Sequence, residues 1–120
     1  MRQRKKAASR LEVFSKIAPG MSASYRVGSD SYGYWISNVD YDRFILECYI
    51  PTNAKYTISW QDGDMTVDPF DPNKEPNVKL MYKYGCWYEY NERTNCWNKM
   101  YSKRLLIDNN PPRIYRDPSF

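Results

Sequence analysis

Residues 22–50, SASYRVGSDSYGYWISNVDYDRFILECYI, carry the clearest fold signal in the chain. Residues 22–27 and 32–39 have the alternation and β propensity of two strands, and the Gly-Ser-Asp between them predicts a tight turn. An Asp-Tyr-Asp turn then leads into residues 43–50, whose nearly continuous apolar run predicts a strand buried on both faces. A three-stranded antiparallel meander is the simplest arrangement of these segments.

The segments on either side extend this pattern. Leu11, Phe14 and Ile17 have helical spacing and are followed by Pro-Gly, so residues 6–17 predict a short helix on a basic arm. Residues 61–77, rich in Asp, Pro and Gly, predict a long exposed loop with little regular structure. Further strands are expected at residues 55–60, 79–85, 86–91 and 96–107, before an irregular segment at 108–112 and a tail at 113–120.

The expected architecture is therefore mainly β. It is a single small domain of antiparallel strands, with a short N-terminal helix and an extended C-terminal tail. Residues 1–19 form the basic arm, and residues 20–120 form the β-rich ligand-binding domain. A chain of 120 residues is long enough for one hydrophobic core.

Composition restricts the classes of function. The 12 Tyr and 4 Trp are more half-polar rings than one core needs, which favours an interface or a ligand pocket. The chain has no His, the usual general base and metal ligand, so we expect no enzyme, no metal site and no cofactor. Cys48 is expected to be an inert core thiol. Cys86 and Cys96 allow a disulfide across a hairpin, but with no signal peptide reduced thiols are preferred.

Charge is concentrated at the N-terminus. The total is +4, whereas residues 1–16 contain six basic residues and one acidic residue, a net +5, which leaves −1 for the rest. A basic terminus can bind polyanions, although such termini are more often solvated. We also expect no membrane partner, because no apolar run approaches the roughly 20 residues that span a bilayer.

An aromatic stripe in the second half of the chain is the first candidate site. Rings that stack on bases, beside cations that neutralise phosphate, would suit a nucleotide. The alternative is that alternating aromatic residues simply pack a β core, and spacing alone favours it. The rings are Tyr82, Tyr84, Trp87, Tyr88, Tyr90, Trp97 and Tyr101, and the cations are Lys79, Lys83, Arg93, Lys99, Lys103 and Arg104.

Two other groups deserve a functional interpretation. Arg113 and Arg116 flank Tyr115 near the C-terminus and could bind phosphates, while terminal Phe120 could be a peg that docks the tail on the body or on a neighbouring subunit. The acids of the long loop could hold Ca²⁺, but they lack EF-hand spacing and a solvated loop is preferred. These acids are Asp62, Asp64, Asp68, Asp71 and Glu75.

Three stretches in shared order resemble one family. Residues 20–39, residues 71–90 and a closing Arg-x-Tyr-x-Asp-x-Ser-Phe pattern are similar to the phage Thoeris anti-defence sponge proteins. The closing pattern consists of Arg113, Tyr115, Asp117, Ser119 and Phe120. Members of that family capture cyclic ADP-ribose signals made by TIR-domain immune enzymes, and some also hold cyclic oligonucleotides.

The resemblance implies a phage-encoded protein that sequesters a cyclic nucleotide without hydrolysing it, in the cytoplasm of the infected host cell. It also implies a homo-oligomer, a dimer or hexamer, with ligand held between subunits by arginines and an aromatic ring. Arg113 lies in the matching motif. The other expected ligand-binding residues are assigned by type alone and are Tyr115, Tyr84, Trp87, Lys103 and Arg104.

The chain departs from the family pattern in its basic arm and at residues 46–53 and 108–112, so the resemblance does not determine which ligand it takes. The main alternative is a protein-binding inhibitor or structural virion component with a Tyr-rich surface. Nucleic-acid binding ranks last, because the body outside the arm carries a net −1.

Overall fold

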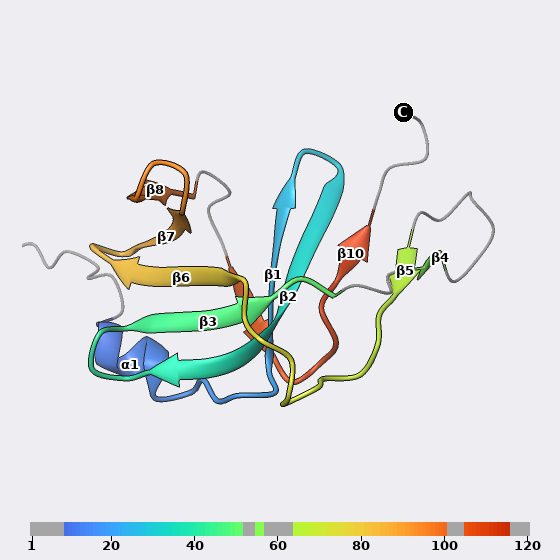
Figure 1. The fold of residues 1–120 in the computed structure, drawn as a ribbon, viewed down its shortest axis with the longest axis horizontal. Coiled ribbons are helices and arrows are strands. Elements are labelled where there is room, and N and C mark those ends of the chain that lie inside the picture. The colour runs from blue at the N-terminus through green and yellow to red at the C-terminus, as the bar shows by residue number, and fades with distance from the viewer. Residues whose placement is uncertain (1–8, 52–54, 57–63, 101–104, 116–120) are drawn as a thin grey trace, which may run out of the picture.

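The computed structural model describes residues 9–51, 55–56, 64–100 and 105–115. Within these residues one short helix accompanies ten strands, which join in one curled antiparallel sheet (Figure 1). The elements are α1 (Arg10–Phe14), β1 (Ser22–Val27), β2 (Asp30–Asp40), β3 (Ile45–Tyr49), β4 (Lys55–Tyr56), β5 (Asp64–Thr66), β6 (Val78–Lys83), β7 (Cys86–Asn91), β8 (Cys96–Lys99), β9 (Leu106–Asp108) and β10 (Ile114–Tyr115).

The long strand β2 organises the sheet. The order is β4-β5-β10-β2-β3-β6-β7-β8, and β1 pairs with β2 and with β9. The predicted meander of β1, β2 and β3 is confirmed, and so is the mainly β fold class. Strands β1 and β7 begin and end at the predicted residues.

The predicted short N-terminal helix is present, although it is five residues long and shorter than the segment 6–17. Three expectations about other elements were wrong. The strand β3 is not buried on both faces along its length, because Leu46 and Cys48 face the core whereas Ile45 and Glu47 remain partly exposed. The loop at 61–77 contains β5, which pairs with β4 and β10. The segment 96–107 contains two strands with different partners, since β8 pairs with β7 and β9 pairs with β1.

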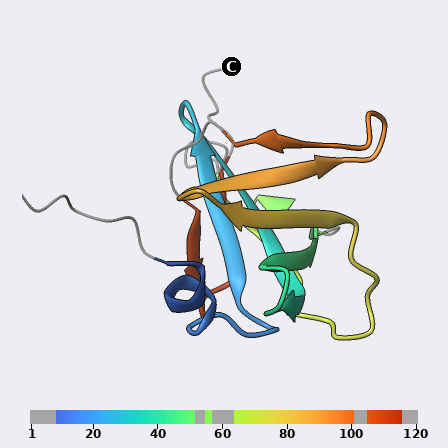
Figure 2. The ribbon, with the colours of Figure 1, turned by 90° about the vertical axis from the view of Figure 1, so that its left-hand side faces the viewer.

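The core lies between the sheet and α1. Ser9 caps the helix, since its side chain accepts a hydrogen bond from the Glu12 amide at 3.2 Å. Phe14 packs its ring against Phe44 and Trp87, at centroid distances of 5.4 and 5.9 Å. Figure 2 shows α1 at the lower end of β1. The buried cluster is Phe14, Ile17, Ala23, Tyr34, Ile36, Leu46, Cys48, Val78, Leu80 and Tyr82.

The segment after β5 packs against the sheet through its aromatic residue. Phe70 lies 5.8 Å from the ring of Trp35 and 6.2 Å from the ring of Tyr49. The Trp35 indole donates to the carbonyl of Asp68 at 3.0 Å, and the Tyr49 hydroxyl accepts from the amide of Asp71 at 2.8 Å. These contacts bury Trp35 and Tyr49, so this end of the sheet is covered on both faces.

The segment that leads into β10 packs against β2 at Gly33, which has no side chain. A Cβ on Gly33 would lie 2.6 Å from Cβ of Pro112 and 3.1 Å from the amide nitrogen of Arg113. That amide donates to the Ser24 hydroxyl at 3.0 Å. Only glycine therefore allows the segment that leads into β10 to cross β2 at this distance.

We expect Gly33→Ala to destabilise the protein by about 1–3 kcal/mol, because the proline ring and backbone must move to admit a methyl group. Urea unfolding measures the loss, and hydrogen exchange at Ile114 should speed up as β10 loosens. Gly28→Ala is the control: Gly28 has φ +61 and open space around it, so its substitution strains the turn and leaves Ile114 unchanged. Unchanged stability and exchange in Gly33→Ala would contradict this account.

Candidate functional site

The sheet separates the aromatic stripe into two faces, because successive side chains of a strand point to opposite sides. Tyr82 and Trp87 are opposite each other in the β6–β7 pairing, and their rings contact at 5.1 Å against Phe14 of the core. Tyr82 is buried, and Trp87 is partly buried beside it. These two rings therefore contribute to packing.

The rings on the other face are partly exposed. Tyr90 is opposite Trp97 in the β7–β8 pairing, and their rings meet edge to face at 5.1 Å. The ammonium of Lys79 lies 6.0 Å from the Tyr90 ring centroid, and the Tyr90 hydroxyl donates to Asn95 at 3.0 Å. By the same alternation Lys99, opposite Tyr88, lies on this face. Aromatic rings and lysines therefore share one open face of the sheet.

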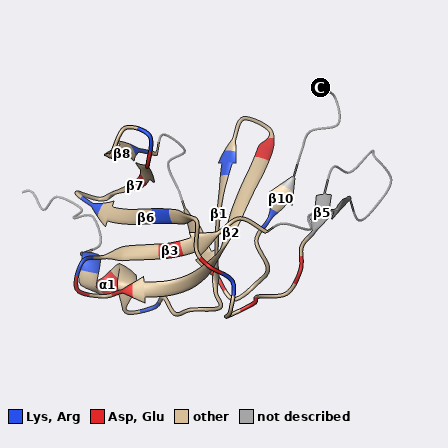
Figure 3. Cartoon of the chain, in the orientation of Figure 1, with Lys and Arg blue, Asp and Glu red and all other residues tan. Residues whose placement is uncertain are grey.

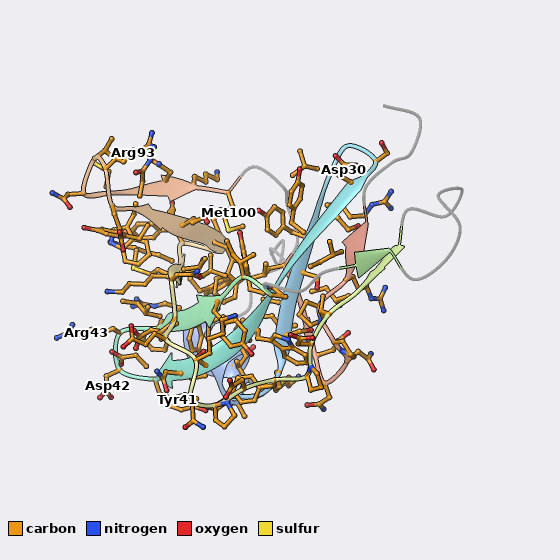
Figure 4. All side chains as sticks on the ribbon, turned by 45° about the vertical axis from the view of Figure 1, so that its right-hand side comes forward. Asp30, Tyr41, Asp42, Arg43, Arg93 and Met100 are labelled. Carbon is orange, nitrogen blue, oxygen red and sulfur yellow. The ribbon has the colours of Figure 1, made fainter. Side chains whose placement is uncertain are left out.

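A cavity of about 420 Å³ lies at this hairpin. Figure 4 shows Arg93 at the tip of the hairpin and Met100 at its other end, nearer the centre of the molecule. The volume falls within the range of roughly 300–1,000 Å³ that is usual for small-molecule sites. Its walls combine amides, carboxylates, a lysine and an aromatic ring, and the lining residues are Asn77, Glu89, Tyr90, Asn91, Glu92, Asn98, Lys99 and Met100.

A hydrogen-bonded chain of phenols connects this cavity to the core. The Tyr34 hydroxyl donates to the Glu89 carboxylate at 3.4 Å, and the hydroxyls of Tyr25 and Tyr34 are 3.1 Å apart. Burial raises the pKa of Glu89 above its ordinary value, and the hydrogen bond from Tyr34 partly opposes this shift. Burial also raises the pKa of Tyr34, so its phenol stays protonated and can donate.

The raised pKa of Glu89 predicts a pH-dependent stability difference. The ionised carboxylate is disfavoured in the folded state, so its penalty is present at neutral pH and disappears as the pH falls toward the ordinary glutamate pKa of about 4.3. We expect Glu89→Gln to be more stable than the wild type at pH 7, with the difference closing near pH 4. Urea unfolding at several pH values measures this. Glu92→Gln, at an exposed carboxyl of the same cavity, controls for charge removal, and a gap that widens toward pH 4 would refute the expectation.

The residues assigned from the sequence lie in separate places. Tyr84 is in the turn between β6 and β7 with its side chain 82% exposed, and Trp87 packs beside the core. Arg113 is exposed just before β10, and the backbone of Tyr115 pairs with Ser31 of β2. The strands β2, β3 and β6 stand between β10 and β7 in the sheet. Lys103 and Arg104, together with Arg116 and Phe120, lie outside the described residues.

Sequence reasoning passed over the polar half of the cavity. In the sequence, Glu89 and Asn91 alternate with Tyr88 and Tyr90. This alternation places Glu89 on the same strand face as Trp87, which packs on the core, and an acid on a core-facing side is a signal that could have identified Glu89. Asn77 and Asn98 carry no local signal, because they come from the end of a loop and from another strand. Only the pairing of β6, β7 and β8 brings these four residues together.

The remaining sequence candidates for chemistry do not form a site in the described residues. Cys86 is opposite Lys83 and Cys96 is opposite Asn91, so the two free thiols sit at opposite ends of β7, too far apart for a disulfide. Cys48 is fully buried, and burial raises the pKa of its thiol. No group of three or more potential metal-ligating side chains occurs within the described part of the chain.

The fold and cavity define a small antiparallel β protein with a mixed polar and aromatic site at an edge hairpin. Comparison with known protein families, with curated proteins and with solved structures finds no match. Among the residues that the structure describes, no helix is long and apolar enough to cross a membrane.

Proposed function

We propose that this protein binds a nucleotide-type anion and does not turn it over. The observation that carries the proposal is the cavity at the β7–β8 hairpin, which combines four binding capacities. Tyr90 can stack on a base and Lys99 can pair with a phosphate. Glu92 can accept hydrogen bonds from a ribose or base, and the Asn77 amide can both donate and accept.

The ligand that we propose is a cyclic nucleotide immune signal, a cyclic ADP-ribose isomer or a cyclic oligonucleotide. This choice of ligand rests on the resemblance to phage Thoeris anti-defence sponges. The aromatic ring and the lysine of the cavity suit such a ligand. In this proposal the protein acts in the cytoplasm of the infected host cell, where sequestering the signal silences the defence that depends on it. The absence of His from the sequence favours capture over hydrolysis.

The proposed protein is a homo-oligomer, as the resemblance implies. Arg113 and the cavity lie in separate regions of one subunit, with three strands between β10 and β7. A ligand held between subunits could contact the cavity of one subunit and the exposed Arg113 of its neighbour. This arrangement would reconcile the arginine implied by the resemblance with the cavity of the structure.

A thermal-shift screen tests the function. Purified protein is heated with cyclic ADP-ribose isomers, cyclic dinucleotides and cyclic trinucleotides, and ligand released by heat is identified by chromatography. Ligand at 100 times Kd stabilises the folded state by about 2.7 kcal/mol, a shift of several degrees. A shift with unaltered ligand recovered would support capture, and recovery of a cleaved product would reject it. No shift with any compound would favour the alternative of a protein-binding inhibitor or virion component.

A further inference from the structure

The strand β8 ends the sheet, and among the described residues it pairs only with β7. The amide of Met100 donates to the carbonyl of Trp87 at 2.9 Å, so the backbone of Met100 points toward β7. Backbone groups alternate in direction along a strand. The amides and carbonyls of Trp97 and Lys99 therefore point away from β7. Figure 2 shows β8 as the outermost strand, above β7.

This edge lacks the usual protections against pairing. Natural edge strands are often interrupted by Pro, by a bulge or by inward-pointing charges. In β8 the residues from Cys96 to Lys99 pair with β7 in unbroken register, and none is Pro. Lys99 is the one charged residue of the strand, and the rest is uncharged (Figure 3). Such an edge is suited to accept another strand.

The hairpin that carries this edge gains little from the core. The strand β6 has three buried residues, whereas no residue of β7 is fully buried and three of the four in β8 are exposed. An isolated hairpin is marginally stable, and a further strand adds hydrogen bonds and covers side chains. Trp97 remains partly exposed although its ring contacts Tyr90. A neighbouring strand would bury the outer side of this ring.

We propose that β8 pairs antiparallel with β8 of a second copy of this chain, about a two-fold axis at Asn98. In this register Trp97 is opposite the partner's Lys99, and each such pair exchanges both of its hydrogen bonds. Residues directly opposite each other share a face of the sheet, so the partner's ammonium lies against the indole in a cation–π contact. The second strand therefore satisfies the outward backbone groups and covers the ring.

Charge and backbone conformation select this register over its neighbours. An axis at Lys99 would place two ammonium groups directly opposite each other, which is destabilising. An axis at Trp97 would place Lys99 opposite the partner's Asn95, whose φ of 51 is not that of a strand. The axis at Asn98 avoids both and places two neutral amides opposite each other. A two-fold interface requires such self-complementarity, so a second copy suits this edge better than an unrelated strand.

The pairing also adds a ring to the cavity of the hairpin. Lys99 lines that cavity and is opposite Tyr88 on its inner side. The partner's Trp97 flanks Lys99 on the outer side. Contact between this cavity and Arg113 of another subunit would need a second interface, because four strands separate β10 from β8. The pairing is tested without ligand, so it stands or falls independently of what the cavity binds.

Cysteine cross-linking tests the register. In a chain with Cys86→Ser and Cys96→Ser, the remaining Cys48 is buried. Asn98→Cys in this background should form a disulfide-linked dimer under mild oxidation, because the two residues at the axis lie within disulfide distance. Lys99→Cys is the control and should cross-link much more slowly, since residue 99 faces residue 97 of the partner. Equal cross-linking of the two variants, or none in Asn98→Cys, would overturn the proposal.

Sedimentation velocity of the unmodified full chain tests the pairing itself. We expect particles with an even number of 14.3-kDa chains. Lys99→Pro removes an outward amide but no hydrogen bond to β7, and Pro is tolerated at such edge positions. It should raise the dissociation constant of the pair by about five- to a hundred-fold, the usual effect of losing two hydrogen bonds, with the circular dichroism of the sheet unchanged.

Lys99→Gln is the matched variant, because it removes the charge but keeps the amide, and it should weaken the pair less than Lys99→Pro. A chain that stays monomeric at its highest soluble concentration would overturn the proposal. Equal dissociation constants for Lys99→Pro and the wild type would also overturn it, since they would place the contact between copies elsewhere on the molecule.

Discussion

Phe14→Ala should reduce the free energy of unfolding by about 3–5 kcal/mol, the usual loss for a buried phenylalanine. Phe14 is 1% exposed and contacts the rings of Phe44 and Trp87, so its removal leaves a cavity between α1 and the sheet. The contact also connects α1 to the β2–β3 turn that carries Phe44. Urea denaturation measures the change.

Leu11→Ala is the matched control, because Leu11 belongs to the same helix but is 71% exposed. Its substitution should alter stability by less than about 0.5 kcal/mol, as is usual for surface positions. Similar losses in the two variants would mean that α1 contributes through helix formation and not through packing. A loss below about 1 kcal/mol in Phe14→Ala would mean that the helix does not dock on the sheet.

Lys99→Glu should weaken binding of the cyclic nucleotide found by the thermal-shift screen by about 10- to 100-fold, which corresponds to loss of a hydrogen bond to a charged group. The substitution places a carboxylate in the cavity wall that already contains Glu89 and Glu92. Isothermal titration calorimetry measures the affinity. Lys16→Glu, at an exposed lysine that does not line the cavity, makes the same charge change and should leave the affinity intact. Unchanged affinity in Lys99→Glu would exclude this cavity as the site.

Mixing variants tests whether two subunits build one site. Arg113→Ala is expected to lose ligand with its fold intact, because the resemblance assigns this arginine to phosphate. If Arg113 of one subunit completes the cavity of another, Lys99→Glu and Arg113→Ala chains that are unfolded together and refolded should recover about a quarter of the sites, as random pairing in a symmetric oligomer predicts. If the mixture recovers no binding, Lys99 and Arg113 do not form one site between two subunits.

Local signals predicted a large part of the fold. The alternation of residues 22–27 and 86–91, with Gly28 directly after the first segment and Gly85 directly before the second, defined β1 and β7 to the residue. The candidate site was predicted less well. The stripe coincides with the β6–β8 segment that contains the cavity, but it grouped Trp87, which packs on the core, with Tyr90, which lines the cavity. To assign Trp87 and Tyr90 to opposite faces of the sheet, the strand register must be known through both hairpins. That register depends on the geometry of the turns.

The amino-acid sequence by itself determined the class of fold, the tight turns, and the lack of histidine chemistry, because these depend on residues close together in the chain or on composition alone. Only the tertiary structure decided that residues 96–107 divide between β8 and β9, that β5 forms within an acidic loop, and that Glu89 meets Tyr34. Each of these features requires a partner distant in sequence. Local propensity does not specify such pairing, which is selected by burial of the whole sheet.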